Sequence, residues 1–171
     1  ELLLLIKNPW QVFLSTDHPN GGCLWRYPEI IQLLMCKDAR AKGIAELNDK
    51  VKGKITLPAI GREYTLYEIA ISMSAGPARA LGLTQKGNLG IGADADIVMY
   101  EEDPNSQTMF GHPRYVIKAG EVVIEDGEIR EAPQGREFLV KPACDESVSE
   151  FMRPLFEDHY TMSFENYPVE Y

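Results

Sequence analysis

The sequence predicts an α/β part followed by a β part, and three observations lead to that prediction. The run Val12-Phe13-Leu14 has no polar alternation, which is typical of a parallel strand covered on both faces. The run Thr65-Leu-Tyr-Glu68 has the form of a helix-initiating capping box. From residue 88 to residue 130, short apolar runs alternate with glycine turns, which is the pattern of a β meander.

The first elements are a helix end and a strand. Leu2 to Ile6 predicts the last turns of a buried helix, because Asn8-Pro9 follows and proline cannot continue a helix. This apolar run is far shorter than the roughly 20 residues of a membrane span or the roughly 7 to 15 of a signal peptide's apolar region, so neither is expected. Because the chain starts inside an apolar segment and without methionine, we expect a fragment or the second half of something larger.

Two further helical regions follow the strand. Apolar positions between Pro28 and Leu47 fit a helix with proline in its first turn, interrupted near Gly43. A polar loop then leads to Arg62. The helix that starts at Thr65 is predicted to break at Gly76-Pro77, to restart there and to end at Gly82.

The second half of the chain is predicted to form short strands. Ala119-Gly120 and Asp126-Gly127 separate the last three of them and are typical of tight hairpin turns. The tail from residue 133 to residue 171 mixes proline, charge and aromatic residues, with a helix expected over 148 to 158. The predicted strands are 88–91, 97–100, 115–118, 121–125 and 128–130.

Composition and charge limit the possible functions. Hydrophobic residues make up 44% and charged residues 25% of the 171 residues, which is typical of a folded globular protein. The net charge of -9 argues against a nucleic-acid-binding surface, which needs lysine and arginine to displace counterions. Cys23, Cys36 and Cys144 are odd in number and widely spaced, so no disulfide framework or zinc knuckle is predicted and a reducing cytoplasm is expected.

Asp17 and His18 are the first candidate functional residues. A carboxylate at the C-terminal end of a buried parallel strand lies where barrel and open α/β enzymes place their ligands and catalytic groups. The alternative is that Asp17 caps a turn through Pro19-Asn20, which aspartate does well. His18 is either a substrate contact or a hydrogen-bonded structural histidine. Both alternatives stay open for each residue.

Other motifs argue against a metal or nucleotide site within this chain alone. His112 and His159 stand apart, and no histidine pair has the spacing of a transition-metal site. Gly90-Ile-Gly92 leads into a strand and not into a helix, so it is not a dinucleotide fingerprint. Asp94-Ala-Asp96 lacks the acids and glycine of a calcium loop and is predicted to shape a turn.

The order of these motifs resembles the C-terminal third of the amidohydrolase superfamily. The motifs are Thr16-Asp-His-Pro19, then Ala75-Gly-Pro-Ala-Arg-Ala-Leu-Gly-Leu83, then Lys86-Gly-Asn-Leu-Gly-Ile-Gly-Ala-Asp-Ala-Asp-Ile-Val98. Further phrases are similar to the amidohydrolase-type subunit of the formylmethanofuran dehydrogenase family over nearly the whole chain. They are Glu1 to Trp10, Thr16 to Gly21, Tyr27 to Ile30, Arg62 to Ala70, Arg114 to Lys118 and Phe164-Glu-Asn-Tyr-Pro168.

The resemblance implies a fold, a site and partners. Residues 1–83 would be strand eight and following helices of a (β/α)8 TIM barrel, 84–132 part of a small C-terminal β-sandwich, and 133–171 a tail packing on the barrel or partner subunits. Asp17 would be both the catalytic acid/base and a ligand of a binuclear zinc centre whose other ligands lie outside this chain, with His18 near the substrate. Expected partners are the N-terminal part of the same subunit, on the same or a separate chain, and other subunits with tungsten or molybdenum pterin and iron–sulfur clusters. No nucleic acid or membrane is expected.

The implied reaction is the reversible condensation of formate with the primary amine of methanofuran during CO2 reduction. Two metal ions would polarise the reacting oxygen while Asp17 moves the proton between water and amine. A related family, the α subunit of the formyltransferase/hydrolase complex of methylotrophs, implies hydrolysis of the formyl amide instead. A third alternative from another class is a non-catalytic assembly module that docks on other subunits.

Overall fold

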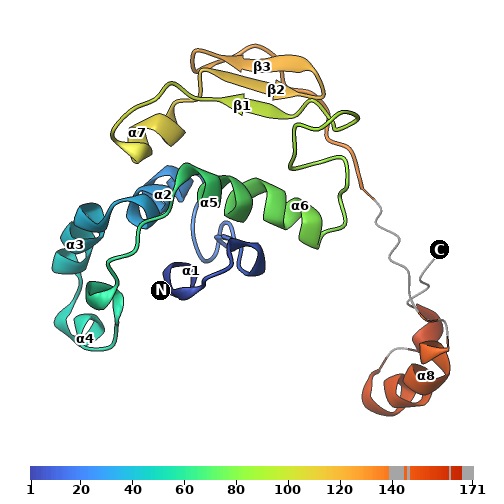
Figure 1. Cartoon of the computed structure of the whole chain (residues 1–171). Coiled ribbons are helices and arrows are strands. Elements are labelled where there is room, and N and C mark those ends of the chain that lie inside the picture. The colour runs from blue at the N-terminus through green and yellow to red at the C-terminus, as the bar shows by residue number, and fades with distance from the viewer. Residues whose placement is uncertain (139–144, 146, 162, 167–171) are drawn as a thin grey trace. The chain divides into compact units, whose positions relative to one another are not determined.

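The computed structural model describes residues 1–138, 145, 147–161 and 163–166. The chain divides into two compact units, Glu1–Gly135 and Arg136–Tyr171, which are described separately. In the first unit, helices form one part and a four-stranded sheet forms the other (Figure 1). The three-part division of the sequence into 1–83, 84–132 and 133–171 stays a prediction, as does its assignment to a barrel and a sandwich.

The N-terminal helix ends before Pro9, as predicted. Helix α1 covers Leu2–Leu5, and the 3-10 turn η1 covers Pro9–Gln11 with the Asn8 side chain accepting from Trp10 N at 3.1 Å. Val12 is extended, but residues 12–17 pair with no strand of the sheet. The predicted strand therefore has no ladder. Its backbone instead runs beside a helix, where Leu14 N donates to Ser72 O at 3.5 Å.

The next helical region breaks at Cys36, and the prediction of a break near Gly43 is wrong. Helix α2 covers Tyr27–Met35 and α3 covers Lys37–Glu46, with Gly43 inside α3. Cys36 is extended, its Sγ accepts from Ala39 N at 3.4 Å, and the Glu63 carboxylate accepts from Lys37 N at 2.6 Å. These acceptors satisfy the first N–H groups of α3, so a new helix starts there.

Arg40 of α3 joins the end of α2 to the following loop. Its guanidinium is buried and donates to the carbonyls of Leu33 and Leu34 at 2.7 and 3.3 Å. It also donates to the carbonyls of Ile60 and Arg62 at 3.2 and 2.6 Å. A cation at a helix C-terminus satisfies the free carbonyls and the dipole there, so Arg40 caps α2 and fixes the loop.

The polar loop predicted up to Arg62 contains short helical turns and closes the core. Helix α4 covers Asp49–Lys52 and η3 covers Leu57–Ala59. Tyr64 is buried, its hydroxyl donates to Leu3 O, and its N–H donates to Leu34 O at 2.9 Å. The buried core residues are Leu4, Ile31, Leu34, Tyr64 and Ile69.

The capping box at Thr65 is confirmed. Helix α5 covers Leu66–Ala70; Thr65 Oγ1 accepts from Glu68 N, and Glu68 Oε2 accepts from Thr65 N at 2.9 Å. The predicted break at Gly76-Pro77 is wrong: the helix continues through a π-helical turn, η4 (Ile71–Ala75), into α6 (Gly76–Ala80). A one-residue widening of the turn accommodates proline without a break. Gly82 ends α6 with φ +71°, as predicted.

The sheet is an antiparallel meander in the order β1-β2-β3-β4. Its strands are β1 (Ile97–Met99), β2 (Tyr115–Lys118), β3 (Glu121–Glu125) and β4 (Glu128–Ile129). Ala119-Gly120 and Asp126-Gly127 have positive φ at both positions, which is the type I′ turn that matches strand twist. Both hairpins are therefore confirmed.

Two elements near the sheet differ from the prediction. Residues 88–91 form no strand, because Asn88 Oδ1 accepts from Gly90 N at 2.9 Å and turns the chain. Helix α7 (Ser106–Gly111) was not predicted; Asn105 caps it by accepting from the N–H groups of Gln107 and Thr108. Gln32 Oε1 accepts from Gln107 N at 3.0 Å, which joins α7 to α2.

The second unit contains helix α8 (Val148–His159), close to the predicted range, and the turn η5 (Phe164–Asn166). Phe156 stacks on Tyr160 at 4.6 Å and meets Phe164 edge-on at 5.7 Å. Arg153 forms an ion pair with Glu165 and lies over the Phe164 ring. Local aromatic contacts therefore hold this unit together. Residues 167 and 168 of the family-like phrase lie outside the described residues.

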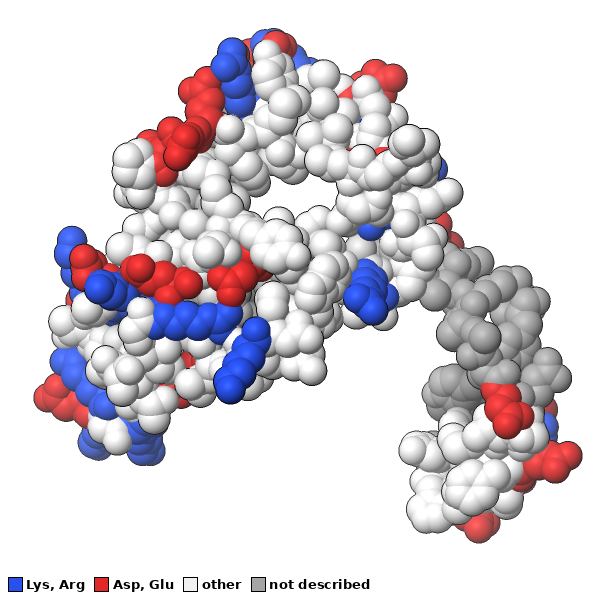
Figure 2. All heavy atoms as spheres, viewed as in Figure 1, with Lys and Arg blue, Asp and Glu red and all other residues white. Residues whose placement is uncertain are grey.

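Charged side chains of both signs are interspersed over the helices and the sheet on the face shown in Figure 2. Among the described helices, none combines the length and the apolar character that crossing a lipid bilayer requires.

Candidate functional site

Asp17 lies at the end of the segment that follows η1, with its side chain exposed and φ at +50°. The backbone closes the turn, because Gly21 N donates to Asp17 O at 2.8 Å. Within the described part of the chain, no donor contacts the Asp17 carboxylate. The side chain therefore does not serve as the turn cap, and the carboxylate is available to a ligand.

Gly21 allows the turn to fold back over Asp17. A Cβ at Gly21 would lie 2.9 Å from Thr16 O, closer than real Cβ atoms approach, and a tight 3.1 Å from Asp17 Cβ. The peptide bond between His18 and Pro19 is cis. Aspartate and asparagine tolerate positive φ better than other residues with a side chain, so the turn accepts an acid at its first position.

His18 supports the loop that follows. Its Nδ1 accepts from Leu24 N at 3.4 Å, and its ring meets the Trp25 ring edge-on at 6.0 Å. Accepting at Nδ1 requires the ring proton to be on Nε2. The imidazole thus has a structural contact at one nitrogen and keeps a donor at the other.

The loop ends in an ion pair at the start of α2. The turn η2 (Leu24–Arg26) precedes Tyr27, and Arg26 donates twice to the Glu29 carboxylate at 2.7 Å. These hydrogen bonds hold the pKa of the Glu29 carboxyl below its usual value. Trp25 is 74% exposed, and Asn20 is exposed as well. The loop after Asp17 is thus a structured turn with one exposed aromatic ring.

The described residues do not form a metal centre by themselves. No group of three or more His, Cys, Asp or Glu side chains lies close enough to hold an ion in the part of the chain that the structure describes. His112 and His159 contact carbonyls of their own helices, of Thr108 at 3.1 Å and Leu155 at 2.9 Å. Cys23 and Cys36 are free thiols, and Cys144 lies outside the described residues.

Asp94 and Asp96 belong to an ion cluster with two lysines. Lys86 Nζ lies 2.5 Å from one carboxylate oxygen of each aspartate, and Lys118 Nζ lies 2.7 Å from Asp96 Oδ2. Ala119 N also donates to Asp96 Oδ1 at 2.9 Å. Hydrogen bonds from Lys118 and then Lys86 hold the pKa of Asp96 well below its usual range. The motif was predicted to shape a turn, but the turn lies before it, at residues 91–92, and the two carboxylates pair with lysines that were not predicted.

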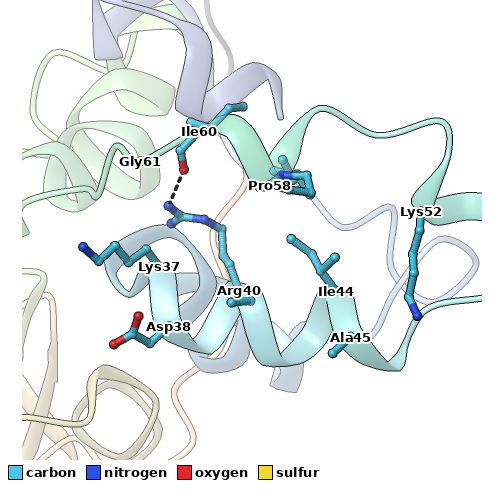
Figure 3. A pocket seen from close by; sticks show the side chains of 11 residues that line it. Lys37, Asp38, Arg40, Ile44, Ala45, Lys52, Pro58, Ile60 and Gly61 are labelled. Atoms are coloured by element: carbon cyan, nitrogen blue, oxygen red, sulfur yellow. Dashed lines mark hydrogen bonds between the residues drawn. The ribbon is translucent and has the colours of Figure 1, made fainter.

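An open pocket of about 550 Å³ lies beside α3 (Figure 3). Asp17 and His18 do not line it. Its walls are mostly apolar, from Ile44, Pro58 and Ile60, and the dashed line marks the bond from Arg40 to Ile60 O. Carbonyls already satisfy the Arg40 guanidinium, and the other charged residues at this pocket are Lys37, Asp38 and Lys52. The Asp17 turn remains the candidate site.

Comparison with known proteins identifies a family model and two curated relatives. The model described as "Amidohydrolase family" matches residues 1–124. FhcA, from the formyltransferase/hydrolase complex of Methylorubrum extorquens, is 38% identical over 169 residues, which are 99% of this chain and 31% of that protein. Protein FwdA of Methanocaldococcus jannaschii is 36% identical over an alignment of 179 positions, gaps included, which covers 98% of this chain and 32% of that protein.

A solved structure has the same fold over nearly all of this chain. It is the X-ray crystal structure of the formyltransferase/hydrolase complex FhcABCD from Methylorubrum extorquens with methylofuran. The TM-score is 0.78 at 38% identity, with 96% of this chain and 30% of that chain covered. The present chain spans about a third of the length of the relatives that it matches.

Proposed function

The chain belongs to the amidohydrolase family, and from that premise we propose that it is the C-terminal portion of the amidohydrolase-type subunit of a formylmethanofuran dehydrogenase. The observation that carries the proposal is the match of 38% and 36% identity along 99% and 98% of the chain to FhcA and FwdA. Because the chain spans about a third of those proteins, the proposed activity is that of the whole subunit.

The proposed reaction joins formate to a primary amine. A C–N bond forms between the formyl carbon and the amine nitrogen, one C–O bond of formate breaks, and a formamide and water result. Starting from the ammonium ion, two protons leave nitrogen and end on the departing oxygen. The reverse reaction is hydrolysis of the N-formyl amide, so each direction needs a group that carries protons between nitrogen and oxygen.

The Asp17 carboxylate is our candidate for that group. It is exposed, no described donor contacts it, and the backbone of its turn is closed by the bond from Gly21 N to Asp17 O. The carboxylate can therefore accept a proton from an ammonium or from water and return it to the leaving group. His18 is proposed to lie near the substrate with its Nε2 proton as a donor, while Nδ1 holds Leu24.

A binuclear zinc centre remains part of the proposal for the whole subunit. When bound, such a centre would supply charge that polarises the formyl oxygen. The residues in this chain fit it only in part, since Asp17 is the one ligand that they offer and no described cluster completes it.

The proposed partners are the N-terminal part of the same subunit, together with the other subunits of the complex. A partner would carry the tungsten or molybdenum pterin and the iron–sulfur clusters and would supply formate from CO2, with methanofuran as the amine. The likeness to a chain of the FhcABCD complex, which was crystallised with methylofuran, supports a place in a multi-subunit complex. A cytoplasmic location is part of the same proposal.

Two alternatives differ in the use of this scaffold. The similarity to FhcA favours a subunit that works mainly in the direction of formyl amide hydrolysis. A non-catalytic assembly module is favoured by the exposed apolar side chains of α8, such as Phe151 and Leu155. Zinc content and formyl amide hydrolysis, measured on the assembled complex, separate these alternatives, because a metal-free inactive assembly supports only the second.

Asp17→Asn in the assembled complex tests the proposal. Asparagine tolerates the positive φ and has the same size, so the variant removes the proton carrier and little else. We expect formation and hydrolysis of the formyl amide to fall about 100-fold or more, while the partner still reduces CO2 to formate.

The matched control is Asp126→Asn, since Asp126 is also exposed with φ +50° but lies in the turn between β3 and β4. This control should keep full activity. Unimpaired turnover by Asp17→Asn would remove Asp17 from the mechanism.

A further inference from the structure

We propose that the packing of Phe13 on Gly76, together with the bond from Leu14 N to Ser72 O, positions the Asp17 carboxylate. Phe13, Ser72 and Gly76 are thus positioning residues, which act through the segment that ends at Asp17. The inference rests on the proposed role of Asp17.

The segment before Asp17 runs along one helix in a matched series of contacts. The Arg79 guanidinium lies over the Trp10 ring at 5.4 Å, Phe13 packs on Gly76, and Leu14 N bonds to Ser72 O. From Trp10 to Leu14 the residue number of the segment rises, while the residue number of its helix partner falls in steps of three and four, from Arg79 to Gly76 to Ser72. The two stretches are therefore antiparallel and in register along the helix face.

The π-helical turn and Pro77 together free the Ser72 carbonyl. In an α-helix, Ser72 O would accept from Gly76 N, but Gly76 N bonds to Ile71 O in the wider turn. The donor that a π-helix would supply is the N–H of residue 77, which is proline and has none. A buried carbonyl without a partner is costly, and Leu14 N takes this position at 3.5 Å.

Gly76 leaves the space that Phe13 fills. A Cβ at Gly76 would overlap Phe13 Cε1 and would lie 2.8 Å from Phe13 Cδ1 and from Ile71 O. Gly76 is buried and Ser72 is fully buried at 0% exposure, so neither contact can relax into solvent. Any side chain at residue 76 must displace the Phe13 ring or open the turn.

Only Ser15 and Thr16 separate the anchored Leu14 from Asp17. A displacement at Phe13 and Leu14 is therefore passed on to the carboxylate with little loss. Misplacement of a reacting group by about 1 Å can lower turnover about 100-fold. The contact thus matters more for turnover than for substrate binding.

The test is Gly76→Ala in the full-length subunit within its complex. We expect kcat for formyl amide hydrolysis to fall about 10-fold to 100-fold, with KM changed less than about twofold because the substrate contacts outside residue 17 stay. The matched control is Gly43→Ala, also a glycine inside a helix, where a Cβ would meet only Leu33 Cδ2 at an ordinary 3.8 Å. That control should keep the full kcat.

The double variant Phe13→Ala/Gly76→Ala decides between positioning and general damage. Phe13→Ala removes the same packing contact from the other side, so it should lower kcat as Gly76→Ala does, and the double variant should be no less active than the weaker of the two single variants. Losses that add in the double variant, or a Phe13→Ala variant with the full kcat, overturn the proposal.

The two proposals fail in different ways. Full activity of Asp17→Asn removes the proposed function and this inference with it. An inactive Asp17→Asn together with a Gly76→Ala variant that behaves like Gly43→Ala removes only the positioning role.

Discussion

The β meander and the helical half of the first unit are held together in different ways. In the meander, two-residue turns join β2 to β3 and β3 to β4, and the paired residues of these strands lie ten positions apart or fewer, as in Tyr115 with Glu125. In the helical half, side chains reach backbone carbonyls far along the chain. Tyr64 bonds to Leu3 O, and Arg40 bonds to Arg62 O at 2.6 Å.

The difference shows which parts of a fold are determined by neighbouring residues in the sequence. A turn dipeptide determines its own hairpin, because the residues that need positive φ are adjacent to the strands that they join. The path of the helical half depends on which carbonyls a single arginine or tyrosine reaches. A substitution in the first region should therefore have a small, local effect and one in the second a large, distributed effect.

The largest effect is expected for Arg40→Met, which tests the helical half. The variant leaves the carbonyls of Leu33, Ile60 and Arg62 without their donor in a buried place. We expect the free energy of unfolding to fall by about 3 kcal/mol. Hydrogen exchange on the full-length protein should speed up over residues 27–64 and stay slow in β2 and β3.

Arg26→Met is the matched control, because Arg26 is exposed and its pair with Glu29 should contribute little to stability. Equal acceleration of exchange in the meander after Arg40→Met would break the comparison, since the two regions would then unfold as one.

A change in unfolding free energy smaller than that of Arg40→Met is expected for Asp96→Asn, which removes the charge at the centre of the lysine cluster. Asp96 accepts from Lys118, Lys86 and the backbone of Ala119, so we expect a loss of about 2 kcal/mol in unfolding free energy at pH 7. The folded-state pKa of Asp96 lies below its unfolded value. Its contribution is therefore fully present above about pH 5 and is lost as the pH falls below about 4 towards the folded-state pKa.

Urea unfolding of both proteins from about pH 3 to about pH 8 measures this difference. Asp126→Asn serves as the control in the same meander, because Asp126 lies 3.8 Å from Arg114 at an exposed site. A gap between Asp96→Asn and the parent chain that does not change with pH would contradict the lysine–aspartate origin of the stability.

The smallest effect is expected for Ala119→Asn and is a gain. Ala119 has φ +51°, which asparagine tolerates better than alanine, and its N–H bond to Asp96 is kept. We expect about 0.5 to 1 kcal/mol of added stability. Thermal unfolding should show no gain for Ala132→Asn, where φ is negative and the residue is exposed. A loss at Ala119 would show that the turn is not set by local conformational preference.

The same distinction explains what the sequence predicted. Strands β2 and β3 begin and end at the predicted residues, and the capping box at Thr65 is present, because each signal lies within four residues of its effect. The break at Cys36 was missed, since its cause includes the distant Glu63 carboxylate. Residues 12–14 were predicted as a strand, but their backbone partner is the Ser72 carbonyl, which becomes free only through a π-turn that no local pattern indicates.

For the candidate site, the sequence predicted the position of Asp17 but not how its turn is built. An acid after an apolar run, followed by Pro19-Asn20-Gly21, indicates a turn at the end of that run. Whether side chain or backbone closes that turn depends on the position of Gly21 N, 2.8 Å from Asp17 O, which only the folded structure reveals. The role of Asp17 as a metal ligand stays a prediction, because no group of side chains among the described residues completes a metal centre.

The positive φ at Asp17 has an evolutionary consequence. The main chain admits aspartate, asparagine and glycine there with little strain, and it makes no use of the carboxylate to close the turn. A single base change converts an aspartate codon into an asparagine codon. On the proposed role of Asp17, a copy without that chemistry is one mutational step away, and its turn would close as before, because the bond from Gly21 N to Asp17 O does not involve the carboxylate.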